Sequence, residues 1–220
     1  MDPTKLASER EQLRVCWAKL GGRLSAEWLA NESEKLQRLR GSDIRQFHDK
    51  FGFKAKDTLK TGGLCAGAIF RTSAFINTEN RSGSRTDQNI HIEHTVEIKD
   101  LVALLKDNLP ASPSGPAALI LKYSVATAMR KSQTDYLAGF PRSMSALNPR
   151  CRWFDQPFMR YERLMEHDDV WNVWTGEKVS TSFSFGDHLE LLCGIFTELD
   201  FDDEIIYSLR LASPSKWLSC

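Results

Sequence analysis

The sequence predicts an α+β fold, in which a helical N-terminal region precedes a core of strands and helices. Three patterns support this prediction. Apolar residues recur every three or four positions from Leu6 to Arg40, which is typical of helix. Apolar and polar residues alternate from Ile90 to Ile98, which is typical of a half-buried strand. The apolar residues then return to helical spacing from Asp100 to Asn108.

Length and composition favour one compact unit. The chain has 220 residues, of which 41% are hydrophobic and 26% are charged, as in ordinary globular proteins. We expect a helical N-terminal region over 1–60, a core over 61–165 and a C-terminal hairpin and helix over 166–220 that pack on this core. No internal repeat is visible in the sequence.

The remaining segments follow from turn residues and apolar runs. Before the alternating strand we expect short strands within Cys65–Ile76 and a polar loop over Asn77–Asn89. After it we expect a linker over Pro110–Pro116, an apolar helix over Ala117–Met129, a hairpin through Val170–Trp174 and Val179–Phe185 around Thr175-Gly176, and a final helix that starts near Asp187. An acidic run, Asp200–Glu204, follows that helix.

The sequence also indicates the compartment. No window holds the roughly 18 consecutive apolar residues that a membrane span needs, and the first residues lack the pattern of a signal peptide. The five cysteines are scattered without a Cys-x-x-Cys pair, so neither a disulfide framework nor a structural zinc site is indicated. We therefore expect a cytoplasmic protein with no membrane partner.

Charge is divided unevenly along the chain, although the formal net charge is +0. Residues 1–165 hold 26 Lys and Arg against 18 Asp and Glu, and residues 166–220 hold 3 against 11. The excess of basic residues over 1–165 would attract a nucleic acid, whose backbone is negatively charged. A basic region that packs on an acidic one explains the uneven charge equally well. We expect DNA as the partner and take as candidate contacts Arg71, Arg81, Arg85, Lys99 and Arg160.

The alternating strand carries the residues that could take part in catalysis. Its apolar side is interrupted at His94, directly after Glu93 and three residues after His91. Neighbouring strand residues point to opposite faces, so Glu93 and His94 can act on one substrate only at a strand end, where the backbone turns. A neutral imidazole accepts a proton near pH 7, and a carboxylate suits Mg²⁺ or Mn²⁺ at a phosphodiester.

The run Glu93-His94-Thr95-Val96-Glu97-Ile98 resembles the first motif of the HNH (ββα-metal) nucleases, in which an acidic residue and then His end the first strand. Glu97 stands where that family usually has Pro. The resemblance implies a ββα-metal core with a helical insertion, in which His94 is the general base and Glu93 holds Mg²⁺ or Mn²⁺. The implied activity is that of an endonuclease on DNA, of the kind used in restriction or phage defence. A homodimer is compatible with it.

The resemblance also implies two further positions. The asparagine that orients the catalytic histidine falls on Asn148, some fifty residues after Val96, so an insertion must lie between them. The third position falls on the following helix, within Asp155–Arg163, where the sequence has no histidine. The nearest one is His167, which we take as the second metal ligand.

Three alternatives remain open. Glu97-Ile98-Lys99 resembles half of the PD-(D/E)XK nuclease signature, with Glu97 on the metal and Lys99 on the water. A non-catalytic module that binds nucleic acid or protein would use the acidic run and the six tryptophans instead. A zinc site from His91 and His94 has a spacing that suits one helical turn better than a strand.

Overall fold

The computed structural model of the chain describes Glu11, residues 68–77, 89–108, 114–137 and 146–214, and Trp217. The prediction of a helical region over 1–60 lies outside these residues, as do Arg81 and Arg85. None of the helices in the described ranges is long and apolar enough to cross a membrane.

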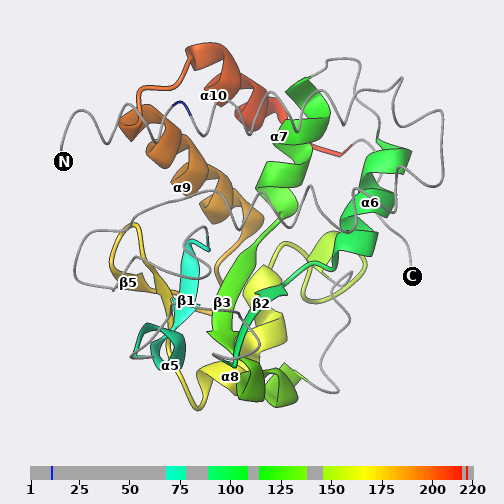
Figure 1. The fold of residues 1–220 in the computed structure, drawn as a ribbon. Coiled ribbons are helices and arrows are strands. Elements are labelled where there is room, and N and C mark those ends of the chain that lie inside the picture. Colours follow the sequence, from blue (N-terminus) through cyan, green and yellow to red (C-terminus); the bar gives the residue numbers. More distant parts are fainter. Residues whose placement is uncertain are drawn as a thin grey trace.

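A five-stranded mixed sheet forms the centre of the described structure, which confirms an α+β fold (Figure 1). The strands lie side by side in the order β2-β3-β1-β4-β5. β1 and β3 are parallel, and the other neighbours are antiparallel. The strands are β1 (Phe70–Thr72), β2 (Ile90–His94), β3 (Ala126–Arg130), β4 (Val170–Asn172) and β5 (Glu177–Lys178).

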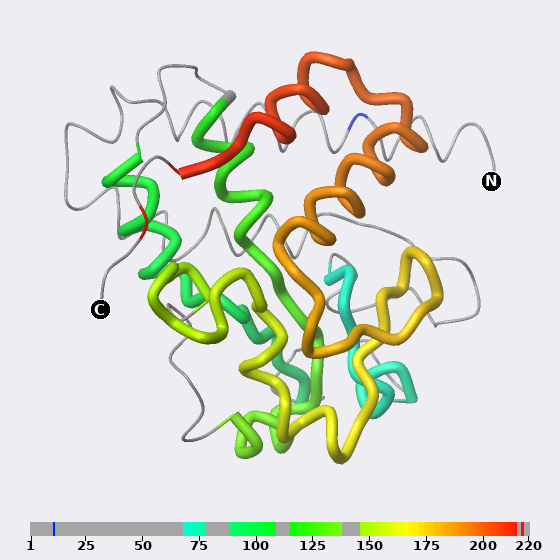
Figure 2. The backbone as a smooth tube through the Cα atoms, turned by 180° about the vertical axis from the view of Figure 1, so that it is seen from behind, coloured from blue at the N-terminus to red at the C-terminus, as the bar shows by residue number. Residues whose placement is uncertain are grey.

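Helices cover one end of the sheet and part of one face. α7, α9 and α10 pack together beyond one end, and α6 lies beside α7 (Figures 1 and 2). The short helices η5 and α8 follow each other against the sheet. The helical elements are α5 (Ser73–Ile76), α6 (Ile98–Asp107), α7 (Ser114–Tyr123), η3 (Lys131–Leu137), η5 (Pro157–Tyr161), α8 (Glu162–Met165), α9 (Phe185–Glu198) and α10 (Asp203–Leu211).

The strand predicted over Ile90–Ile98 is shorter than expected. β2 ends at His94, and α6 begins at Ile98, with Glu97 as its N-cap residue. The backbone N–H groups of Asp100 and Leu101 donate to the Glu97 carbonyl, which closes the first turn of the helix. The prediction was wrong at this end because Ile98 continues the alternation of the strand and also begins the apolar face of the helix.

The helix predicted over Ala117–Met129 is a helix followed by a strand. α7 ends at Tyr123, and Ala126–Arg130 forms β3 in the middle of the sheet. β3 pairs with β2 on one side and β1 on the other, and four of its five residues are buried. A strand buried on both faces shows no alternation, so its apolar run cannot be distinguished from a buried helix by pattern alone.

In the last third of the chain, the turn and the helix starts lie at the turn and cap residues of the sequence. The predicted hairpin is confirmed as β4 and β5, and Gly176 has a φ of 80°, which glycine adopts without strain. Its second strand is Glu177–Lys178 rather than Val179–Phe185. α9 begins at Phe185 after a capping box of Ser184 and Asp187. The acidic run leads into α10, whose positive N-terminal end favours acidic residues.

The two faces of β2 contact different parts of the molecule. Ile90 and Ile92 belong to a small cluster of buried residues with Ala68, Phe75, Ala126 and Ala128. The larger core, which includes Phe70, Met129, Phe158 and Tyr161, lies on the opposite face of the sheet. Because side chains alternate along a strand, His91 and Glu93 share the face of the larger core, and His94 shares the face of Ile92.

Candidate functional site at the edge of the sheet

The short helix η5 lies against β2 and brings Arg160 to Glu93. Pro157 fits the first position of η5 because it has no N–H to pair. Phe158 packs edge-on against Phe70, with ring centroids 5.0 Å apart, and thereby anchors η5 to β1. This packing anchors η5 to the sheet, and Arg160 of η5 reaches Glu93 on β2, one of the two edge strands of the described sheet.

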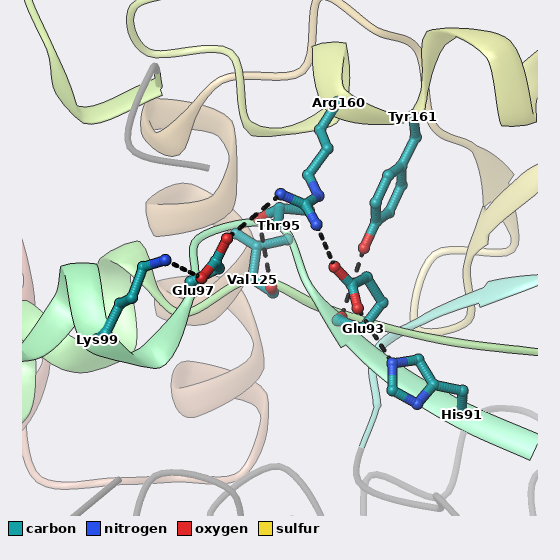
Figure 3. A network of polar contacts seen from close by, with 8 residues as sticks. All are labelled: His91, Glu93, Thr95, Glu97, Lys99, Val125, Arg160 and Tyr161. Atoms are coloured by element: carbon teal, nitrogen blue, oxygen red, sulfur yellow. Dashed lines mark hydrogen bonds and ion pairs between the residues drawn. The ribbon is translucent and has the colours of Figure 1, made fainter. Parts of the chain in front are cut away.

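Arg160 forms a short ion pair with Glu93 (Figure 3). Its Nη2 donates to Glu93 Oε1 at 2.7 Å, and the two side chains are only 19% and 16% exposed. Nη1 lies 3.9 Å from Glu97 Oε1, at the limit of an ion pair. The Nε of Arg160 is buried and has no hydrogen-bond partner in the described part of the chain. The guanidinium therefore lies between two carboxylates.

His91 contacts the other oxygen of the Glu93 carboxylate. Its Nε2 lies 3.0 Å from Glu93 Oε2, and its side chain is 42% exposed. Figure 3 shows the imidazole and the guanidinium on opposite sides of the Glu93 carboxylate. Glu93 thus connects a half-exposed histidine to a mostly buried arginine.

These contacts keep Glu93 ionised. Burial by itself would raise the pKa of this carboxyl, but the hydrogen bond from His91 and the positive charge of Arg160 together hold the pKa below its ordinary value of 4.5. Tyr161 stays neutral, because burial raises its pKa well above 10.0. The Tyr161 hydroxyl lies 3.4 Å from the backbone carbonyl oxygen of Glu93.

Glu97 and Lys99 lie at the start of α6. Lys99 Nζ is 2.6 Å from Glu97 Oε2, and both side chains are well exposed. The PD-(D/E)XK alternative needs its carboxylate and lysine on a strand, whereas these residues precede and begin a helix. The structure therefore does not support that alternative for this pair.

The other predicted site residues have different surroundings, although His94 is close enough for its charge to help lower the pKa of Glu93. His94 is the last residue of β2 and points to the opposite face. Asn148 is buried, and its Oδ1 accepts a hydrogen bond from the Arg150 backbone at 3.0 Å, so it shapes a local turn. His167 is exposed and packs on the Tyr136 ring, with centroids 4.8 Å apart. The described structure does not bring Asn148 or His167 to the ion pair.

The residues predicted to contact phosphate have different surroundings in the structure. Arg71 is completely buried in β1, where its Nε donates to the Ala68 carbonyl oxygen at 3.0 Å and its guanidinium lies over the Phe75 ring. A side chain at this position cannot reach a polymer at the surface. Lys99 is exposed, and Arg160 is engaged by Glu93.

The described donors do not fit a divalent metal. Mg²⁺ and Mn²⁺ prefer several oxygen ligands around one point. Glu93 Oε1 pairs with Arg160 and Oε2 with His91, and Glu97 pairs with Lys99. Within the described residues no group of three His, Cys, Asp or Glu side chains is arranged to hold a metal. Arg160 occupies the position between the carboxylates that a cation would need.

Comparisons with known proteins give no further information about the site. No protein-family model, no curated protein and no solved structure matches the chain. Functional inference therefore depends on the residues themselves.

The sequence indicated both members of the ion pair but not their contact. Glu93 and Arg160 are 67 positions apart, and no spacing rule connects a strand residue to a helix residue at that distance. Tyr161 was missed, since a tyrosine beside an arginine has no distinctive pattern. The alternation of the strand did place His91 and Glu93 on one face.

Proposed function

We propose that the chain is a nuclease that hydrolyses phosphodiester bonds of DNA at the cluster of His91, Glu93 and Arg160. The observation that carries the proposal is the 2.7 Å ion pair of Arg160 and Glu93 directly beside a half-exposed histidine. It puts a guanidinium and an imidazole at one place on the edge of the sheet.

This combination suits the chemistry of a phosphodiester. The bond is hydrolysed when a water loses a proton as it attacks phosphorus and when positive groups stabilise the charge on the phosphate oxygens. A guanidinium offers several N–H donors in one plane; Nη2 of Arg160 pairs with Glu93, and Nη1 lies 3.9 Å from Glu97, at the limit of an ion pair.

The order of elements supports the same proposal. The Glu93-His94 motif ends β2, which is antiparallel to β3, and α6 and α7 lie between the two strands in the sequence. η5 and α8 come later in the chain, and η5 contacts β2 through Arg160. The HNH resemblance implies a ββα-metal core with a helical insertion, and an antiparallel strand pair with helices between its strands is compatible with that expectation.

The proposal assigns no metal to Glu93, because the described donors do not fit one. Arg160 supplies the positive charge next to this carboxylate instead. The role of His94 as general base, implied by the resemblance, stays a prediction, and the two histidines of β2 are compared experimentally below.

The proposal is tested by incubating the full chain with supercoiled plasmid, linear duplex DNA, single-stranded DNA and RNA, each with Mg²⁺, with Mn²⁺ and with EDTA. We expect nicked or linear products from DNA. Binding without cleavage under every condition would contradict the proposal and favour a module that only binds nucleic acid. An absence of both binding and cleavage would favour a protein interaction module.

A further inference from the structure

We propose that His91, positioned by Glu93, takes the proton from the attacking water, an inference that rests on the proposed nuclease function. The contact that carries it is the 3.0 Å distance from His91 Nε2 to Glu93 Oε2. The motif resemblance assigns this role to His94, so the structure points to a different histidine of the same strand.

The carboxylate determines which ring nitrogen of His91 carries the proton. An ionised carboxylate only accepts hydrogen bonds, so the Nε2 that faces it must donate. In the neutral ring, Nδ1 is then the unprotonated nitrogen. The His91 side chain is 42% exposed, and within the described residues its ring contact is the one from Nε2 to Glu93, which leaves Nδ1 for a water molecule. A substrate water can therefore meet a nitrogen that accepts a proton.

Arg160 holds Glu93 in this orientation. It pairs with Oε1 and leaves Oε2 for His91, so the carboxylate cannot rotate without losing one of two charge-assisted contacts. The low pKa of Glu93 keeps it an acceptor at neutral pH. Glu93 is thus a positioning residue, and His91 is the group that meets the water.

The proposed step balances. Nδ1 of His91 takes one proton from a water molecule while the water oxygen bonds to phosphorus. The bond from phosphorus to the leaving sugar oxygen breaks, and its electron pair goes to that oxygen, which takes a proton from solvent. The products are a phosphomonoester and an alcohol, and His91 then returns its proton to solvent.

The other histidines in the described ranges are less suited to this role. His94 points to the face of β2 that carries Ile92, away from Arg160. His188 is buried in α9, and its Nδ1 lies 2.8 Å from the Lys122 carbonyl oxygen. His167 packs on Tyr136. His91 combines a 3.0 Å contact to the Glu93 carboxylate with a side chain that is 42% exposed.

The orientation is tested without any activity assay, by ¹⁵N NMR of the histidine rings in the full chain. We expect neutral His91 to be protonated on Nε2. In Glu93→Gln, Arg160 holds the amide oxygen, so the amide N–H faces His91 and moves the ring proton to Nδ1. Wild-type His91 protonated on Nδ1, or a tautomer unchanged in Glu93→Gln, would overturn the inference.

The catalytic role is tested by single-turnover cleavage of DNA. His91→Gln keeps a donor for Glu93 but cannot take up a proton, so we expect about a 10² to 10⁴-fold loss of rate. The control is Arg210→Gln, which replaces an exposed side chain outside the cluster and should keep the wild-type rate. A wild-type chain that cleaves and a fully active His91→Gln overturn this inference alone. A wild-type chain that never cleaves overturns the nuclease proposal and the proton transfer with it.

Discussion

Arg160 of η5 and Glu93 of β2 are joined by a 2.7 Å ion pair across 67 positions of sequence. The pair is mostly buried and is continued on one side by His91 and on the other by Glu97. Because each carboxylate oxygen of Glu93 has its own partner, the pair ties a helix to the edge of the sheet and orients a histidine.

Removal of Arg160 should destabilise the fold. Arg160→Ala leaves Glu93 mostly buried without the donor of its 2.7 Å ion pair, and we expect a loss of about 1 to 3 kcal/mol in the free energy of unfolding. Urea denaturation measures this difference. The control is Arg210→Ala, which breaks the exposed pair of Arg210 with Glu190. Equal unfolding midpoints for both variants would show that the buried pair has no special stabilising role.

Acid should destabilise the protein through His188. Burial lowers the pKa of this histidine from 6.5 to about 4, so the folded state stays neutral where the unfolded chain takes up a proton. Stability is therefore lost as pH falls from 6.5 to about 4, by about 3 kcal/mol in total. His188→Asn keeps a donor for the Lys122 carbonyl and should flatten this dependence in urea titrations. An equally steep dependence in the variant would exclude His188 as the cause.

Gln133 joins η3 to β1 and to the segment before β4. Its Oε1 accepts from Thr72 Oγ1 at 2.8 Å and from the Arg130 N–H at 2.9 Å, and its Nε2 donates to Asp168 Oδ2 at 2.7 Å. Gln133→Met removes the acceptor of the Thr72 hydroxyl and of the Arg130 N–H, and one of the donors to Asp168, and should cost about 1 to 3 kcal/mol. The exposed neighbour Ser132→Ala is the control in the same thermal unfolding assay, and indistinguishable midpoints would contradict this assignment.

Divalent metal should not bind at Glu93. Ligands that bind only the folded state raise its stability, so millimolar Mg²⁺ or Mn²⁺ should leave the thermal midpoint unchanged if both Glu93 oxygens stay with Arg160 and His91. Scanning calorimetry with and without EDTA measures this. A metal-dependent rise in the midpoint that disappears in Glu93→Gln would restore Glu93 as a metal ligand.

Local patterns of the sequence were sufficient for much of the fold. The alternation at Ile90–His94, the turn at Gly176 and the capping residues before α9 each act within a few residues, and the structure has a strand, a hairpin and a helix there. β3 was missed because its apolar residues are buried on both faces and show no period. The end of β2 was missed because Ile98 fits both neighbouring patterns.

The candidate site depends on contacts that local patterns do not encode. The alternation of β2 puts Glu93 and His91 on one face, but the partner of Glu93 comes from η5, whose position is set by the packing of Phe158 on Phe70. The resemblance emphasised His94, the neighbour of Glu93 in sequence. Along a strand, however, it is the residue two positions away that lies on the same face.

The role of the Arg160–Glu93 pair in DNA hydrolysis is tested by cleavage of supercoiled plasmid with wild type, Arg160→Ala and Arg210→Ala, each verified as folded. We expect cleavage by the wild type, a loss of about 10²-fold in the single-turnover rate for Arg160→Ala, and no change for Arg210→Ala. Equal rates for the two variants, or no cleavage by the wild type, would contradict a DNA-hydrolysing site at Arg160 and Glu93.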